Sequence, residues 1–193
     1  TVLSRGLGDV YKRQISKKAI GAHKKATLPR SYWDWGEQIE ANSVGAFPYT
    51  PATNLLYGLN EAIAMLKEEG LNNVFSRHKR HAEATRLAVQ TWGLEVLCEE
   101  KEDFSNTLTA VLLPNGYNAD EFRSVVLDNF NMSLGNGLSR LAGKVFRIGH
   151  LGDFNDLMLI ATLGGIEMGL SKSSIPHQVG GTQAAMQFLK QST

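Results

Sequence analysis

Residues 143–152 read GKVFRIGHLG, and this stretch decides how the rest of the chain is interpreted. Alternation along an extended strand puts Phe146 and Ile148 on one face and Arg147 on the other. The segment is therefore predicted to form a strand over residues 144–149 that places one cation among apolar neighbours.

An arginine in the middle of a strand needs an anionic partner if it is buried. A guanidinium offers a carboxylate a rigid two-pronged fork, and Gly149 and Gly152 leave room beside it. Arg147 is therefore a candidate carboxylate-binding residue. Two other interpretations stay open at this point, a structural ion pair and an edge-strand arginine that reaches water.

Around this strand, the pattern from residue 71 onward predicts a small α+β domain. Asn118 is expected to cap a helix. Strands joined by hairpins and helical returns predict a mostly antiparallel sheet with helices on one face. The expected strands are residues 94–98, 107–113, 132–134 and 144–149. The expected helices are residues 118–130 and 182–190, one from residue 72 or 73 to about 92, and one that Asp153 or Asn155 caps and that reaches about residue 169.

Residues 15–70 are expected to contain no strands. Residues 31–36 are aromatic and irregular, and residues 46–51, with two prolines, are expected to form a fixed extended loop. A helix with leucines at helical spacing follows and ends at Gly70. We therefore expect residues 15–70 to belong to something larger and residues 71–193 to form the small domain.

Residues 1–14 fit no helix or strand period and include no initiator methionine. Residues 4–14 resemble the translation of a sequencing-transposon adaptor, and the alternative is an ordinary polar tail. The adaptor interpretation predicts that natural sequence begins near Ile15 and that the gene is cut off upstream.

Composition narrows the possible functions. The chain has 193 residues, of which 42% are hydrophobic and 20% charged, as in a globular protein. A net charge of +1 favours neither nucleic acid nor a membrane surface as a partner. The single cysteine, Cys98, excludes an internal disulfide and a Cys-built zinc site. It indicates a reducing compartment such as the cytoplasm, and we expect it to end a strand as inert core.

Several local patterns imitate functional motifs. Residues 135–137 lack the third glycine of a dinucleotide-binding turn, and residues 137–144 are one residue too long for a phosphate-binding loop. The basic run at residues 78–81 is expected to be a solvated helix face. The histidines show no metal-ligand spacing with carboxylates, so no metal site is expected.

The sequence from Arg147 to Leu157, RIGHLGDFNDL, resembles a segment of the serine–glyoxylate aminotransferases. These are class V members of the fold-type-I pyridoxal-phosphate enzymes and are related to alanine–glyoxylate aminotransferase. The similarity spans nearly the whole chain from about Ser16. It includes KKA at 17–19, FPYTP at 47–51, LYGL at 56–59, EGL at 69–71 and the stretch from Gly164 to Gly169.

The resemblance implies that the chain is the C-terminal fragment of an α/β parent enzyme of fold type I. Residues 15–70 would be the remnant of its large cofactor-binding domain. The implied cofactor is pyridoxal 5′-phosphate, the implied substrates are an amino acid and the 2-oxo acid glyoxylate, and the implied assembly is a homodimer.

The resemblance also implies roles for two residues. Arg147 matches the arginine that binds the substrate α-carboxylate. Thr50 matches a threonine that reaches the cofactor phosphate of the partner subunit, and the alternative for Thr50 is a loop-capping hydroxyl. Phe47 replaces a phosphate-binding tyrosine of related enzymes and removes its hydroxyl, a role that Tyr49 could take.

A Schiff-base lysine is implied in a Gly-Ser-x-Lys segment shortly before the region matching Ser16, and this chain has no such segment. Lys17, Lys18, Lys24 and Lys25 lie in a polar basic stretch, whereas such a lysine needs a desolvated or cation-adjacent pocket. We therefore expect no catalytic residue here and no activity from the chain alone.

The implied reaction of the parent enzyme is transfer of an amino group from serine or alanine to glyoxylate. The alternatives are another class V enzyme, such as a cysteine desulfurase or a phosphoserine aminotransferase, and a non-catalytic assembly domain. A desulfurase needs a mobile, exposed cysteine, and Cys98 is badly placed for that role.

Overall fold

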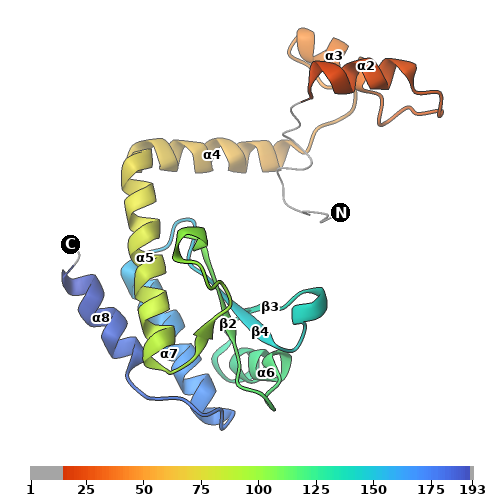
Figure 1. The fold of residues 1–193 in the computed structure, drawn as a ribbon. Coiled ribbons are helices and arrows are strands. Elements are labelled where there is room, and N and C mark those ends of the chain that lie inside the picture. Colours follow the sequence, from red (N-terminus) through yellow and green to blue (C-terminus); the bar gives the residue numbers. More distant parts are fainter. Residues whose placement is uncertain (1–14, 192–193) are drawn as a thin grey trace. The chain divides into compact units, whose positions relative to one another are not determined.

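The computed structural model describes residues 15–191, so the adaptor interpretation of residues 1–14 lies outside the described residues (Figure 1). Contacts divide the chain into two compact units between Glu61 and Ala62. The expected division of a longer protein into domains at residue 70 stays a prediction, because it concerns the fold of that protein rather than these units.

The first unit is helical, and residues 15–61 contain no strand, as the sequence predicts. It holds α2 (Lys17–Lys25), α3 (Trp35–Ser43) and the first part of α4 (Thr53–Glu69). The prediction of irregular structure through residue 36 is wrong, because α3 begins at Trp35. Asp34 caps this helix by accepting a hydrogen bond from the backbone N–H of Gly36 at 2.7 Å.

The second unit is the α+β part of the chain. Gly70 turns α4 into α5 (Leu71–Thr91) with a φ of +83°, a value that favours glycine. Asn118 caps α6 (Ala119–Phe130) as predicted, by accepting from the N–H of Asp120 at 2.8 Å. The remaining helices are α7 (Asp156–Lys172) and α8 (Gly181–Gln191), with short 3-10 turns at Lys101–Asp103 and Ser139–Leu141.

Within residues 15–191, four strands form one antiparallel sheet in the order β1-β2-β4-β3. They are β1 (Glu95–Val96), β2 (Leu108–Leu112), β3 (Gly135–Asn136) and β4 (Val145–Gly149). The predicted strand at residues 132–134 is wrong, since pairing with β4 begins only at Gly135. The mostly antiparallel sheet with helices is otherwise as predicted.

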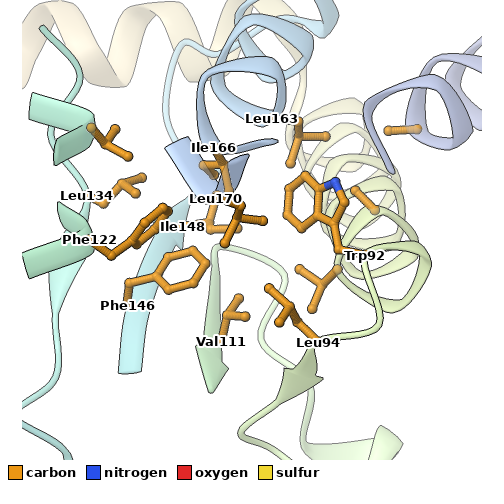
Figure 2. Packing of buried hydrophobic residues seen from close by; sticks show 14 of the residues in the cluster. Trp92, Leu94, Val111, Phe122, Leu134, Phe146, Ile148, Leu163, Ile166 and Leu170 are labelled. Atoms are coloured by element: carbon orange, nitrogen blue, oxygen red, sulfur yellow. The ribbon is translucent and has the colours of Figure 1, made fainter. Parts of the chain in front are cut away.

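The hydrophobic core lies between one face of the sheet and the helices α5 to α8 (Figures 1 and 2). Val111, Phe146 and Ile148 point into it from the strands and are fully buried. Each such side chain contributes about 1.5–3 kcal/mol by leaving water. Because side chains alternate along a strand, Arg147 must lie on the opposite face.

Among residues 15–191, no helix combines the length and the apolar character that crossing a membrane requires.

Candidate functional site

Arg147 stands at the centre of β4, between two small cross-strand neighbours. Its Cα pairs with Ala110 of β2 on one side and with Gly135 of β3 on the other. The edge-strand interpretation is therefore wrong, because β4 has a strand on both sides. The neighbouring positions Phe146 and Ile148 anchor the strand from beneath, since both side chains are buried in the core.

The guanidinium of Arg147 has no counter-ion within residues 15–191. Its Nε is buried and has no hydrogen-bond partner, and the terminal nitrogens form no hydrogen bond or ion pair in the described part of the chain. The interpretation as a structural ion pair is therefore not supported. A half-buried cation left without a partner is a group that an incoming anion can satisfy.

Hydrogen bonds hold every second residue of the loop that follows β4. His150 is fully buried, and its Nε2 accepts a hydrogen bond from the hydroxyl of Thr109 at 2.9 Å. The N–H of Gly152 donates to Nε2 of His78 at 3.2 Å. Nη1 of Arg77 donates to the carbonyl oxygens of Gly152 and Phe154, both at 2.9 Å.

Asp156 is the fourth residue held in this way, and it contacts two side chains of α5. Nη2 of Arg80 donates to its Oδ1 at 2.7 Å, and Nε2 of His81 lies 2.8 Å from the same oxygen. Burial lowers the pKa of His81, although its hydrogen bond with Asp156 opposes that shift. Asp156 also opens α7, so this ion pair fixes the end of the loop and the start of that helix.

The basic run of α5 thus has a structural role that its sequence does not reveal. The prediction of a solvated helix face holds for Lys79, which is exposed, and is wrong for His81, which is completely buried. The ion pair of Arg77 with Glu69, at 2.6 Å, further links the loop to the end of α4. The partner Asp156 lies 75 residues from His81 in sequence, so no local pattern could have indicated the contact.

Thr50 lies in the first unit, on the loop between α3 and α4. Its side chain is exposed, and its hydroxyl forms no hydrogen bond within residues 15–191. The neighbouring Tyr49 holds the loop in place, because its hydroxyl donates to Oε2 of Glu37 at 3.0 Å. The loop-capping alternative for Thr50 therefore has no support, and the hydroxyl of Tyr49 is already engaged with Glu37 of α3.

Cys98 is not the inert core residue that the sequence predicts. It is half-buried beyond the end of the two-residue strand β1, and its thiol donates to the carbonyl oxygen of Glu100 at 3.5 Å. It lines a small cavity of about 180 Å³ together with Arg86 and Phe104. Within residues 15–191, no group of three or more His, Cys, Asp or Glu side chains is placed to hold a metal ion.

The two residues expected to bind ligands thus share one property. Each offers hydrogen-bond donors that no described residue uses: the guanidinium of Arg147 in the second unit, and the hydroxyl of Thr50 in the first. Both groups sit on segments held by other contacts, as residues that receive an anion require. Each group is therefore available to donate to an incoming anion.

The chain is similar in sequence to several named glyoxylate aminotransferases. The chain is 43% identical to the serine–glyoxylate aminotransferase of Methylorubrum extorquens, over 99% of this chain and 48% of that protein. It is 38% identical to the L-aspartate–glyoxylate aminotransferase of Paracoccus denitrificans, over 93% of this chain and 46% of that protein. No protein-family model matches the chain.

Among solved structures, pyridoxamine–pyruvate aminotransferase from Mesorhizobium loti matches with a TM-score of 0.81 and 28% identity. The match covers 93% of this chain and 47% of that one. The chain therefore spans about half the length of the relatives it resembles, which fits a C-terminal fragment of such an enzyme. The structural likeness shows the fold of the fold-type-I aminotransferases.

Proposed function

We propose that this chain, a homologue of the class V pyridoxal-phosphate aminotransferases, is part of an enzyme that transfers an amino group to glyoxylate. The observation that supports this function is the guanidinium of Arg147, which is held on a central strand and has no partner within residues 15–191. The relatives are named for amino-acid and glyoxylate substrates, and both of those molecules carry a carboxylate.

In this proposal Arg147 binds the carboxylate of the amino acid and of the 2-oxo acid in turn. The guanidinium stays charged throughout, so it orients each substrate without taking or giving a proton. Pyridoxal phosphate, when bound, supplies the electron sink for the amino-group transfer. Thr50 donates its hydroxyl to the cofactor phosphate in the partner subunit.

We propose serine or alanine as the amino donor, because the Methylorubrum relative is named for serine. The Paracoccus relative, at 38% identity, is named for L-aspartate, so the donor differs among proteins of similar likeness. The desulfurase alternative is not favoured, because Cys98 is half-buried and hydrogen-bonded. A non-catalytic assembly domain is not favoured, because these two relatives are named as enzymes.

The role of Thr50 requires a second subunit, so we further propose that the parent enzyme is a homodimer. We also propose that it works in the cytoplasm, because a single cysteine suits a reducing compartment. Sedimentation of the longer protein measures the first point, and cell fractionation measures the second. A stable monomer that retains full activity would contradict the role of Thr50.

The kinetic test uses a longer enzyme, made by joining this chain to the residues that precede the matched region in the Methylorubrum relative. Arg147→Ala should lower kcat/KM for serine and glyoxylate by about 10- to 100-fold, because hydrogen bonds to a charged group are worth about 1.5–3 kcal/mol. Arg140→Ala, which removes an exposed arginine, is the matched control. Equal kinetics in the two variants would remove Arg147 from the site.

The cofactor contact is tested separately from the substrate contact. Thr50→Ala should weaken pyridoxal phosphate binding by about 3- to 10-fold, the loss of roughly one hydrogen bond. Thr50→Ser keeps the hydroxyl and should retain most of the affinity. Identical cofactor dissociation in all three proteins would leave the loop without its proposed role.

A further inference from the structure

Gly135 contacts the side chain of Arg147 directly. A Cβ atom at Gly135 would lie 3.0 Å from Cβ of Arg147 and 3.1 Å from its Nε, closer than such atoms ordinarily approach. The φ of Gly135 is not among the positive values of the chain, so backbone conformation does not require a glycine here. The demand for glycine comes from the arginine side chain lying against β3.

This contact explains which atoms of the guanidinium are covered. Nε is buried without a hydrogen-bond partner, whereas the terminal nitrogens are not among the buried unpartnered atoms. The side chain of Arg147 therefore lies over Gly135 with Nε shielded and Nη1 and Nη2 left as its accessible donors. A carboxylate can then meet the guanidinium only end-on, through the two terminal nitrogens.

β3 and β4 are each held in place by residues other than Gly135 and Arg147. Nε of Arg123, on α6, donates to the carbonyl oxygen of Leu134 at 2.7 Å, just before β3 begins. A second nitrogen of Arg123 pairs with Asp120 at 3.0 Å. β4 is fixed in turn by its core residues. A methyl group added at Gly135 would therefore turn Nε of Arg147 away from β3. It would also press on Cβ of Arg147, which can give by a few tenths of an ångström only together with β4.

We propose that Gly135 is a positioning residue for substrate binding, and that it sets an end-on approach of the carboxylate to Arg147. The inference rests on the proposed function, because it assumes that Arg147 binds a carboxylate. It adds the direction of approach and a second residue that controls it through the arginine. Gly135 itself touches no reacting atom.

The test uses the 193-residue chain and glycolate as the probe. Glycolate has the carboxylate of glyoxylate but no carbonyl, so it does not condense with lysine amines. Backbone amides of β4 and the Nε–H of Arg147 are followed by NMR at constant ionic strength, with chloride as the reference anion. Wild type should show saturable shifts in β4 amides and slow solvent exchange of the Arg147 Nε–H.

Gly135→Ala should weaken glycolate binding between about two-fold and ten-fold, the effect of forcing one side chain away from its preferred rotamer. It should also speed exchange of the Arg147 Nε–H. Gly164→Ala is the matched control, because its added Cβ makes only an ordinary contact, 3.9 Å from Cγ2 of Thr182. In an Arg147→Ala background, Gly135→Ala should have no further effect on binding.

Each outcome separates the two proposals. If wild type and Arg147→Ala respond equally to glycolate, the proposed function fails. If wild type binds through Arg147 but Gly135→Ala binds as tightly, only the role of Gly135 is overturned. A large downfield shift of the Nε–H on glycolate addition would show a hydrogen bond at Nε and overturn the end-on approach.

A second variant protects the test against a Gly135→Ala protein that does not fold. In Arg123→Lys a single ammonium nitrogen replaces the two separate nitrogens that now reach Asp120 and the carbonyl of Leu134, so the variant loosens β3 without adding bulk. It should speed exchange of the Arg147 Nε–H and weaken glycolate binding. Unchanged exchange in a folded Arg123→Lys protein would overturn the proposal.

Discussion

Acid should destabilise this protein mainly through His150, the residue that follows β4. Its ring is fully buried, its Nδ1 lies 3.2 Å from the carbonyl oxygen of Asn106, and its Nε2 lies 2.9 Å from the hydroxyl of Thr109. A carbonyl can only accept, so Nδ1 carries the proton and Nε2 accepts. Burial lowers the pKa of His150 from 6.5 to about 4.

The direction of the effect follows from that pKa. The unfolded chain takes up the proton near pH 6.5, whereas the folded protein resists until about pH 4. Stability is therefore lost as the pH falls through this window. Each pH unit within it corresponds to about 1.4 kcal/mol, so lowering the pH from 7 to 5 should reduce the free energy of unfolding by about 2 kcal/mol.

Urea unfolding at the two pH values measures this loss. Trp33 and Trp35 are first replaced by Phe, so that the fluorescence of the fully buried Trp92 reports on the second unit alone. His150→Gln is the matched control, because a glutamine can donate to Asn106 and accept from Thr109 but does not titrate. The buried His81 stays in both proteins and adds the same slope to each.

The comparison between the two proteins decides the matter. The His150→Gln protein should be less stable at pH 7 and should lose about 2 kcal/mol less than the parent between pH 7 and pH 5. Equal losses in the two proteins would refute the assignment of the acid effect to His150.

Three further predictions concern the second unit. Glu167→Gln should lower the free energy of unfolding by about 2 kcal/mol. Burial raises the pKa of Glu167, but hydrogen bonds from the hydroxyl of Thr182 and from the N–H groups of Gly180 and Thr182 outweigh it and bring the pKa to about 2. Urea unfolding that matches the parent would contradict this prediction. Gly181→Ala should lower the free energy of unfolding by about 1–3 kcal/mol, since its Cβ would overlap Trp92 and lie 2.7 Å from the carbonyl oxygen of Ala88. Gly164→Ala, whose Cβ makes only an ordinary contact with Thr182 at 3.9 Å, should show no such loss in the same urea unfolding experiment. Arg77→Lys should speed amide hydrogen exchange at Gly152 by about 10-fold, because one ammonium nitrogen cannot take the places of the three guanidinium nitrogens that reach Glu69 and the two carbonyls. Lys79→Ala is the control on the same helix, and equal exchange in both variants would show that Arg77 does not hold the loop.

Much of the second unit could be predicted because its signals are local. Gly70 separates two helices by its positive φ, and Asn118 caps α6 through its own side chain. The strand around Arg147 follows from alternation within five residues. In each case the residue that decides the structure lies inside the element it shapes or directly beside it, so a single sequence carries the information.

The incorrect predictions concern residues whose structure is decided by contacts with residues far away in the sequence. The predicted strand at residues 132–134 fails because Met132 packs instead against Gly165 of α7, where an added Cβ would meet it at 2.8 Å. Cys98 is not core, because β1 stops at Val96. The sequence does not predict that Gly135 lies beside Arg147, because the contact depends on the pairing of β3 with β4, which the sequence pattern does not show.

Contacts hold residues 150, 152, 154 and 156, which are every second residue of the loop after β4. The structure therefore depends more on the number of residues in this loop than on their identity. Surface loops ordinarily accept insertions and deletions. Here, removing one residue would move the exposed Leu151 to the position of the buried His150. It would also move the exposed Asp153 to the position of Gly152, whose carbonyl oxygen accepts a hydrogen bond from Arg77. Among natural variants of this protein, we therefore expect substitutions at the outward positions to be common, and changes in the residue count between β4 and α7 to be absent.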